Sequence, residues 1–576
     1  MRDSAIGDLR PLIEEAMEEW HVPGLAIAVV QEDEPLLLAA YGRRDVEADL
    51  PVTTDTRFAL CSITKSFTAA GLGMLVDERR LDWTKPVRDY IPEFRLHDPV
   101  ATDRITVRDL LCHHSGLPRH DWIWMPGDLS RAEMLAAMRH LEPSRDIRGQ
   151  FQYQNLGYLV AGMAAERITG QSWEDFTRDR LLKPLDMVHA GFALEDLQKP
   201  GNAAWPYVVV EEERRRARLW PITDTPAGGL TASISDMVNY LRFYQGEGRF
   251  KEKQLLSLEI IRLMQAPLVY VDPPQFEEFG DHHYGLGLAT HQYRGERVVA
   301  HSGGWIGWGT LMSMLPARRL GVVVLTNRSP SAVTELLVLT VFDRICGKEP
   351  ISWIERFRAR KRRFLERRRA DRTAHEAARR RGAAPPRPLD EYAGAYEHPG
   401  YGRITIEAGA EGLRWLNRGL AAGLVHRHYD VFEVPEDPMS LSPDLLHMTF
   451  LYDRDGQIDR LSAPLEPLAP EILFTRLPEG EATDPAFRAA CAGVYLGGLT
   501  RHVVALDGDG QITLSPAGQP TYHLVPYRGR TFRIRELNGY RVEFRRNEQG
   551  VVDGIIFHQP DGTFLAERIE EKATGV

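Results

Sequence analysis

The chain has 576 residues, of which 43% are hydrophobic and 26% are charged. At roughly 150 residues per domain, this length predicts about three to four domains and excludes a single small module. The balance of residue types is that of a soluble globular protein and excludes a disordered or fibrous chain. The formal net charge of -10 argues against nucleic acid or an anionic membrane as the main partner, because either one favours a basic surface.

The sequence contains no signal for a membrane, a disulfide framework or a metal. No apolar run approaches the roughly 20 residues that span a bilayer, and the first residues lack an apolar secretory segment. We therefore expect a cytoplasmic protein with no membrane partner. Neither a phosphate-binding glycine loop nor a zinc-protease motif is present, so no cofactor and no metal are predicted. Four widely spaced cysteines without a CxxC pair favour reduced structural thiols: Cys61, Cys112, Cys346 and Cys491.

The first 350 residues alternate between helical and strand patterns. Residues 6–20 carry apolar positions at helical spacing, and residues 25–41 read as two strands around an acidic turn. Helical patterns then fill residues 62–190. Helices bracketed by strands imply a mixed α/β domain. Further strands are predicted at 284–289, 298–301, 309–315 and 321–325.

The second half of the chain has a different pattern. Residues 351–381 are strongly basic and predict a solvated linker helix rather than a nucleic-acid site, because no aromatic interleaving accompanies the charge. Beyond Pro388 short alternating runs indicate β structure, and the phrase around Tyr396 has an echo around Tyr495. We expect two small β domains. The predicted boundaries are 1–348 for the α/β domain, 349–386 for the linker, and 387–480 and 487–573 for the β domains.

A serine and a lysine open the first long helical pattern. Ser62 and Lys65 stand three residues apart, so they share a helix face and the amine can approach the hydroxyl. The positive end of the helix dipole would stabilise an oxyanion formed beside the serine. A Ser-x-x-Lys string is common by chance, and alone it indicates little.

Two further motifs follow in a fixed order. They are Tyr153-Gln154-Asn155 and His301-Ser302-Gly303-Gly304. With Ser62 and Lys65 they resemble the penicillin-recognising serine hydrolases, peptidase family S12, which include serine β-lactamases, DD-peptidases, esterases and D-aminopeptidases. The resemblance covers residues 6 to about 345. It includes the phrases at 22–24, 106–118, 228–236 and 284–287.

The resemblance implies a fold and a set of roles. The fold is an α/β (α+β) serine β-lactamase-like domain with a mixed antiparallel sheet and a helical lobe, followed by two all-β lipocalin-like barrels. Ser62 would be the acylated nucleophile, and Tyr153 would exchange protons with it and with the leaving group. Lys65 would accept a proton or give electrostatic support, and Asn155 would orient Lys65 and bind the substrate amide. Whether Lys65 or Tyr153 is the general base stays open.

The third motif, residues 301–304, is expected to lie on a β-strand that lines one side of the cleft. The backbone N–H groups of Ser62 and Gly304 would form the oxyanion hole, and Gly303 would let the strand approach the substrate closely. Trp305 would line the substrate pocket, as Trp122, Trp124 and Trp308 could, although core packing explains these aromatics equally well.

His301 departs from the family pattern. β-Lactamases and DD-peptidases typically have Lys-Thr-Gly here, and the cation supports binding of a substrate carboxylate. A neutral imidazole binds a carboxylate much more weakly, although a protonated one could still serve, and His301 is counted among the expected catalytic residues. The resemblance therefore moves toward D-aminopeptidases and esterases, in which histidine is found at this position. The alternative is that His301 is a packed strand residue without a catalytic role.

The two β domains strengthen the resemblance to D-aminopeptidases, in which one such domain sends a loop into the cleft and limits it to free-amine substrates. An acid near the cleft would pair with that amine. The alternative for each candidate acid is a solvated surface charge. The candidates are Glu277, Glu278, Asp281, Glu481 and Asp484.

The predicted function is a serine hydrolase that cleaves amide bonds of small peptides or amino-acid amides, with D-residues favoured. The alternatives are a carboxylesterase or acyltransferase on the same scaffold, and a slowly deacylating penicillin-binding sensor. The expected partner is a small molecule or short peptide, with neither nucleic acid nor membrane, and a homo-oligomer is left open.

Overall fold

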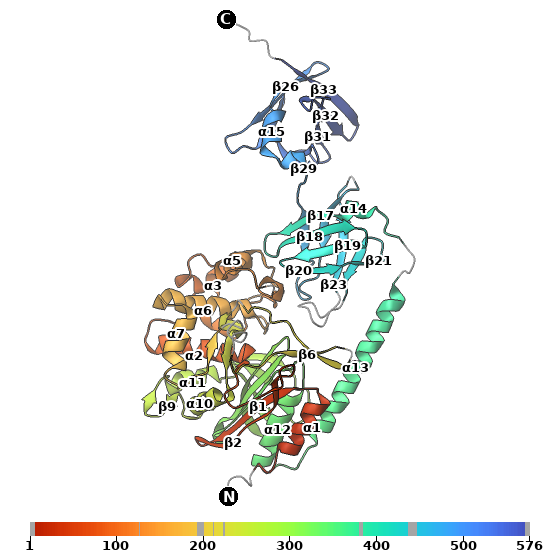
Figure 1. The fold of residues 1–576 in the computed structure, drawn as a ribbon. Helices are drawn as coiled ribbons and strands as arrows, with labels where there is room; N and C mark the ends of the chain where they lie inside the picture. Colours follow the sequence, from red (N-terminus) through yellow and green to blue (C-terminus); the bar gives the residue numbers. More distant parts are fainter. Residues whose placement is uncertain are drawn as a thin grey trace.

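The computed structural model describes residues 6–125, 127–192, 201–210, 212–222, 225–379, 384–435, 446–454 and 456–570. An α/β domain, a long helix and two β domains follow one another along the chain (Figure 1). This arrangement confirms the predicted fold class, an α/β domain followed by two barrel-like sheets.

The α/β domain is built on a nine-stranded antiparallel sheet. Its order is β11-β12-β13-β14-β15-β16-β1-β2-β3, so the first strand pairs with the last, with Leu25 opposite Thr326. The strands are β1 (Gly24–Gln31), β2 (Glu34–Asp45), β3 (Leu50–Pro51), β11 (Val269–Asp272), β12 (His282–Tyr284), β13 (Ala289–Tyr293), β14 (Glu296–Trp305), β15 (Trp308–Leu315) and β16 (Leu320–Thr326).

Helices cover both faces of the sheet. The apolar run of β1 is buried on both sides because successive side chains point to opposite faces. Ala26 and Ala28 face the helical lobe, whereas Ile27 and Val29 face α1 (Arg10–Glu19) and α12 (Val333–Ile345). The lobe consists of α2 (Thr64–Asp77), α3 (Pro99–Arg104), α4 (Val107–Leu111), α5 (Arg131–Ala137), α6 (Asn155–Thr169), α7 (Trp173–Thr177), α9 (Thr225–Gly228), α10 (Ile234–Gln245) and α11 (Leu258–Met264).

Most predicted elements are present, with two corrections. The opening helix is shorter than residues 6–20, and the predicted strand at 284–289 is interrupted between β12 and β13. The interruption packs against α2, because a Cβ on Gly287 would lie 2.7 Å from the carbonyl oxygen of Lys65. Gly287 also has φ +72°, which glycine adopts without strain. The turn therefore supports the helix that carries Lys65. Short strands complete the domain: β4 (Phe58–Ala59), β5 (Gly191–Phe192), β6 (Tyr207–Val210), β7 (Glu213–Arg216), β8 (Leu230–Ala232), β9 (Arg249–Phe250) and β10 (Lys253–Gln254).

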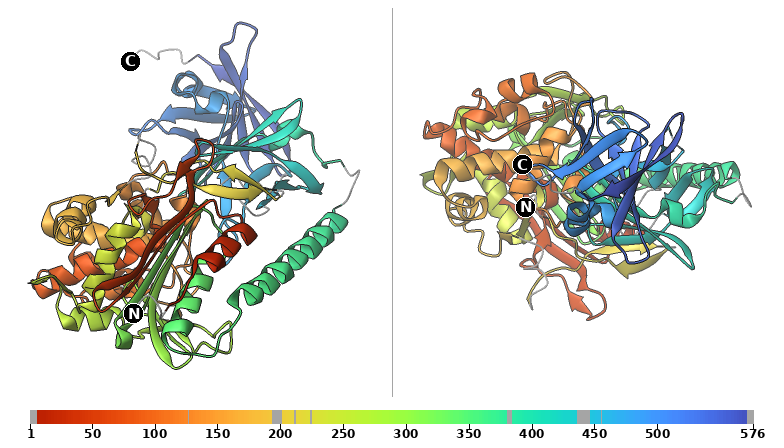
Figure 2. Two further views of the ribbon diagram at one scale, coloured as in Figure 1. Left: turned by 60° about the horizontal axis from the view of Figure 1, so that its bottom comes forward. Right: turned by 90° about the horizontal axis from the view of Figure 1, so that it is seen from above.

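The basic segment forms the helix α13 (Trp353–Ala378), which runs from the α/β domain toward the β domains (Figure 2). Only its first turns are buried, through Trp353, Ile354 and Phe357. Trp353 donates its indole N–H to Asp343 of α12 at 2.9 Å. Most of the helix beyond these turns is exposed, and His375 near its end contacts Glu433 of the first β domain.

The two β domains close in the same way. In the first, Arg476 of the last strand donates to the carbonyl of Ala393 and lies 5.7 Å from the ring of Tyr396. In the second, Arg568 donates to Ala492 and lies 5.9 Å from Tyr495. The sequence echo is therefore a repeated contact between the first and last strands.

The first β domain is a nine-stranded sheet, and the second is a closed barrel of β26 to β33. Short helices precede them, α14 (Leu389–Tyr392) and α15 (Pro485–Cys491). The strands of the first are β17 (Gly394–His398), β18 (Gly402–Gly409), β19 (Gly412–Asn417), β20 (Leu420–Gly423), β21 (Val425–His428), β22 (Val431–Val434), β23 (Leu446–Tyr452), β24 (Ile458–Ser462) and β25 (Leu473–Arg476). Those of the second are β26 (Gly493–Gly497), β27 (Thr500–Leu506), β28 (Ile512–Pro516), β29 (Tyr522–Arg528), β30 (Thr531–Ile534), β31 (Arg541–Arg546), β32 (Val552–Gln559) and β33 (Gly562–Ile569). Among the described residues, none of the helices has the length and apolar character needed to cross a membrane.

Replacing Asp343 by alanine should destabilise the α/β domain. Its buried carboxylate accepts hydrogen bonds from Tyr293 at 2.7 Å, Arg294 at 2.8 Å and Trp353. Removing one partner of a buried charged cluster costs about 3–5 kcal/mol. Urea unfolding followed by tryptophan fluorescence measures the loss. Asp371→Ala, at an exposed position of α13, is the control and should change stability by no more than about 0.5 kcal/mol. Equal effects of the two substitutions would contradict the anchoring role of Asp343.

Candidate active site

Ser62 lies in a short 3-10 turn, η1 (Cys61–Ile63), directly before α2. Ser62 is partly exposed, whereas residues 64–75 of α2 are all buried. Cys61 has φ +51°, a left-handed conformation that is costly for a residue with a side chain. A residue in a strained backbone conformation therefore precedes Ser62, and Ser62 is partly exposed although the helix that follows it is buried.

Lys65 is fully buried and lies beside Ser62. Its Nζ is 3.2 Å from the Ser62 Oγ, as the three-residue spacing predicts. The same amine donates to Asn155 Oδ1 at 2.7 Å and to the carbonyl of Ala227 at 2.8 Å. A buried amine needs such acceptors, and these three come from η1, α6 and α9. The amine is therefore held within hydrogen-bond distance of the candidate nucleophile.

Tyr153 and Asn155 approach from the start of α6. The Tyr153 ring lies between two cations, with Lys65 Nζ 4.8 Å and the Arg119 guanidinium 5.1 Å from its centroid. His113 packs against the same ring at 4.3 Å and accepts a hydrogen bond from the Gln154 N–H. Burial lowers the pKa of His113 well below its usual range, so it supports the loop as a neutral ring. His113 lies within the phrase 106–118 that the family resemblance includes, and its contact with Tyr153 was not among the predictions.

Asp121 is a site residue that the sequence did not indicate. It accepts a hydrogen bond from Asn155 Nδ2 at 3.1 Å and from the indole N–H of Trp124 at 2.9 Å, and it forms an ion pair with Arg119. Asn155 is therefore fixed at both ends, by Asp121 and by Lys65. A lone Asp in a loop carries no sequence signal that could have predicted this contact.

His301 is buried in β14. Its Nδ1 lies 2.6 Å from the Ser302 carbonyl, which can only accept, so Nδ1 carries the hydrogen. Its Nε2 then accepts from the Tyr284 hydroxyl at 2.8 Å. Burial, followed by the charge of Lys65, lowers the pKa of His301 to about 3. The ring is neutral at pH 7 and both of its nitrogens are engaged, which suits a positioning role rather than that of a carboxylate anchor.

Gly303 and Gly304 occupy different environments on β14. A Cβ on Gly303 would lie 2.2 Å from the Leu60 carbonyl oxygen and 2.4 Å from Thr310 Oγ1. A Cβ on Gly304 would find no atom closer than 4.0 Å. Gly303 therefore allows β14 to pack directly against the turn that carries Ser62, which brings the two expected oxyanion-hole segments together.

The tryptophans divide between pocket and core. Trp305 is partly exposed and packs on Trp124 with ring centroids 5.0 Å apart. Trp124 in turn is bound to Asp121, so both rings belong to the neighbourhood of the site. Trp308 is fully buried and belongs to the core. Trp122 contacts the first β domain through Trp415 and Asn417.

The first β domain docks on the segment that contains Asp121. Arg418, in the turn between β19 and β20, donates to the carbonyls of Trp122 and Ile123 at 3.1 and 2.9 Å. Glu466 accepts the backbone N–H of His120 at 2.7 Å, and the Tyr401 hydroxyl lies 2.6 Å from His120 Nδ1. This β domain therefore borders the site through the segment 119–128.

The candidate acids for a substrate amine have other contacts. Glu278 pairs with Arg356 of α13, Glu481 pairs with Arg546 in the second β domain, and Asp484 caps α15. Glu277 and Asp281 are exposed in the segment before β12. Among the described residues, no hydrogen bond or ion pair joins these acids to Ser62, whereas Asp121 contacts Asn155 and Glu466 contacts the backbone of His120.

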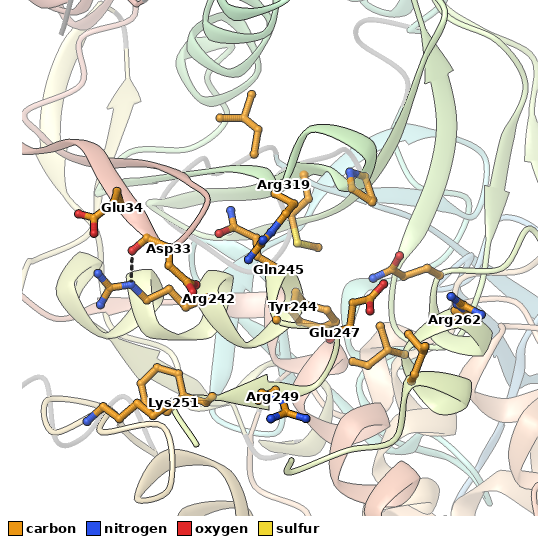
Figure 3. Close-up of a pocket in the computed structure, with 18 of the residues that line it drawn as sticks. Asp33, Glu34, Arg242, Tyr244, Gln245, Glu247, Arg249, Lys251, Arg262 and Arg319 are labelled. Carbon is orange, nitrogen blue, oxygen red and sulfur yellow. Dashed lines mark hydrogen bonds between the residues drawn. The ribbon is translucent and has the colours of Figure 1, made fainter. Parts of the chain in front are cut away.

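A second cavity lies apart from this site. It has a volume of about 860 Å³ and opens where the β1–β2 turn faces the end of α10 (Figure 3). Arg242 donates there to the backbone carbonyl of Asp33 at 2.9 Å. Arginines and acids line it together, and none of the candidate catalytic residues takes part.

Replacing Gly303 by alanine should separate β14 from η1. The new methyl group would meet backbone, so the strand must shift, and a misplacement of this size costs about 100-fold in reaction rate. The rate of Ser62 acylation by a nitrophenyl ester is measured by quenching the reaction at set times and recording the intact protein mass. Gly304→Ala, which has room for the methyl group, should keep the parent chain's thermal stability. A Gly303→Ala variant with normal acylation would contradict the close-packing role.

Acid should destabilise the protein from pH 6.5 downward. The pKa values of His301 and His291 are lowered to about 3, and those of His120 and His398 to about 4, in each case first by burial. The unfolded chain therefore binds more protons than the folded one between these values and about 6.5, so stability is lost as pH falls through this window. The free energy of unfolding in urea, measured from pH 7 to 4.5, should fall steadily. A flat profile would contradict the burial of these rings.

Comparisons with known proteins fit this geometry. A family profile described as Beta-lactamase matches residues 9–339, and one described as a domain of unknown function (DUF3471) matches residues 378–477. The protein named Unguisins hydrolase ungD' of Aspergillus campestris is 28% identical over 420 residues, which cover 69% of this chain and 77% of that protein. Protein flp of Staphylococcus aureus is 26% identical over 341 residues, covering 57% of this chain and 64% of that protein.

A solved structure shares the fold. The octameric penicillin-binding protein homologue from Pyrococcus abyssi aligns with a TM-score of 0.53 at 24% sequence identity. The alignment covers 81% of this chain and 99% of that one. At this identity the likeness concerns the fold alone.

Proposed function

Because this chain belongs to the beta-lactamase family, we propose that it is a serine hydrolase that is acylated on Ser62 and cleaves amide bonds of small peptides or amino-acid amides, with D-residues favoured. One observation carries the proposal: the buried Lys65 amine lies 3.2 Å from Ser62 Oγ and is fixed there by Asn155. This arrangement places the Lys65 amine where it can support the Ser62 oxygen electrostatically or, after losing a proton, accept the proton of the hydroxyl.

The reaction proceeds in two stages. The Ser62 oxygen attacks the substrate carbonyl, and its proton passes to Lys65 or Tyr153. The negative oxygen that forms accepts hydrogen bonds from the backbone N–H groups of Ser62 and Gly304. The C–N bond then breaks, and the leaving amine takes up a proton. Water attacks the acyl-enzyme in the second stage and releases the acid, which restores Ser62.

The substrate class follows from the charges at the site. A neutral His301 gives no cation to hold a substrate carboxylate, and Arg119 is already paired with Asp121. Substrates that depend on a carboxylate, such as β-lactams and C-terminal D-alanyl peptides, therefore fit less well than small amides. The two C-terminal β domains favour a D-aminopeptidase-like preference, and the relative named as a hydrolase supports hydrolysis over mere binding.

A carboxylesterase is the second candidate function. It is favoured by the positions of Glu278, Glu481 and Asp484, whose contacts lie with Arg356, Arg546 and α15 and not with a substrate amine. An ester substrate needs no such acid. A cytoplasmic location stays a prediction, and the oligomeric state stays open.

An assay on matched substrates tests the proposal. D-alanine and L-alanine p-nitroanilides, each with a free and an acetylated amine, are compared with the corresponding esters. Turnover of the free-amine D-amide is expected, and Ser62→Ala should abolish it because the nucleophile is lost. Ser515→Ala in the second β domain is the control and should retain full activity.

Each outcome has a distinct meaning. Ester turnover without amide turnover would replace the amidase by the carboxylesterase. A lasting adduct on Ser62 in intact-mass spectra, without turnover, would indicate a slowly deacylating sensor. Unchanged turnover in Ser62→Ala would overturn the acyl-enzyme mechanism itself.

A further inference from the structure

Three potential metal ligands meet where the end of the linker helix reaches the first β domain. His375 lies in the last turn of α13, Glu433 in β22 and His447 in β23. Glu433 and His447 are directly opposite each other in the antiparallel pair of β22 and β23. The pairing register of β22 and β23 therefore places Glu433 and His447 side by side, and α13 contributes His375.

Their ligand atoms converge on one point. His375 Nε2 lies 2.9 Å and His447 Nε2 lies 3.6 Å from the Oε2 of Glu433, and all three atoms are within 4.8 Å of one another. Ligands at ~2.1 Å from a tetrahedral zinc ion lie ~3.4 Å apart. Small side-chain rotations are enough to place the three atoms around such an ion.

The Nε2 atom of His447 provides a second observation. It is buried, and it makes no hydrogen bond in the part of the chain that the structure describes. Its ring stacks on that of His375, with centroids 5.2 Å apart and planes at 13°. A buried polar nitrogen without a hydrogen-bond partner is costly unless something binds it.

We propose that His375, Glu433 and His447 bind a divalent cation of the zinc class. Two imidazole nitrogens and one carboxylate oxygen are a donor set that zinc prefers, and three protein ligands leave a fourth position for water. The sequence predicts no metal, because these residues are 72 positions apart at their extremes and follow no spacing motif.

Arg427 contacts two members of the cluster. Its Nη1 contacts His375 Nε2 and lies 3.2 Å from Glu433 Oε2, so one guanidinium nitrogen reaches two of the three ligand atoms. The arginine compensates the charge of Glu433, which is only 6% exposed. A bound cation would take over this compensation, and Arg427 would have to move away.

Metal binding would join the linker helix to the β domain. One ion would then be coordinated by a residue of α13 and by residues of β22 and β23. The same β domain borders the catalytic segment through Arg418 and Glu466, so the ion would help to hold that domain in place. This inference does not depend on the proposed hydrolase activity.

Cobalt(II) spectroscopy on the full-length chain tests the proposal. After treatment with a chelator, addition of Co²⁺ should give visible d–d absorption that saturates at one ion per chain, and Zn²⁺ should displace it. Zn²⁺ should also raise the thermal unfolding temperature. His375→Ala and His447→Ala should each weaken binding by at least ~100-fold. His523→Ala removes an exposed histidine that pairs with Glu536 alone, and it should bind the ion like the parent chain.

Arg427→Met distinguishes a metal site from a simple ion-pair network. If the arginine competes with the ion, its removal should tighten Zn²⁺ binding by at least tenfold, and added Zn²⁺ should restore the stability that the variant loses. If the cluster is only an ion-pair network, Arg427→Met will lower the stability of the protein, and added Zn²⁺ will not restore it. Absence of saturable cobalt absorption, or cobalt binding that survives both histidine substitutions, would overturn the proposal. Circular dichroism without metal checks that each variant is folded.

Discussion

The site depends on how a fully buried lysine is accommodated. Removing an amine from water is costly, and Lys65 can remain in the core only because Ser62, Asn155 and Ala227 accept its hydrogen bonds. These acceptors belong to η1, α6 and α9, so the requirement of one amine fixes three elements relative to one another. The nucleophile is thereby positioned by the same contacts that satisfy the lysine.

The constraint continues outward from Lys65. Asn155 is held from its other side by Asp121, and Asp121 lies in the segment 119–128 on which the first β domain docks. A displacement of that domain would therefore act on the orientation of Asn155. The first β domain is thus linked to the catalytic groups through the segment 119–128.

The linker helix connects the α/β domain to the first β domain, and the two β domains share one contact pattern. Trp353 fixes one end of α13 to Asp343, and His375 meets Glu433 at the other end. Each β domain joins its first and last strands by an arginine that contacts a tyrosine and a backbone carbonyl. The helix therefore contacts the α/β domain at one end and the first β domain at the other.

Sequence by itself determined the elements whose information is local. The apolar run of β1, the three-residue spacing of Ser62 and Lys65, and the basic helix all follow from residue periodicity and charge, which act over a few positions. Only the tertiary structure decided the contacts between distant segments. It separated β12 from β13 at Gly287, neutralised His301 by burial, placed Asp121 beside Asn155, and directed Glu278 and Glu481 to arginines outside the site. Burial and pairing between residues far apart in the chain depend on packing, and no local pattern encodes them.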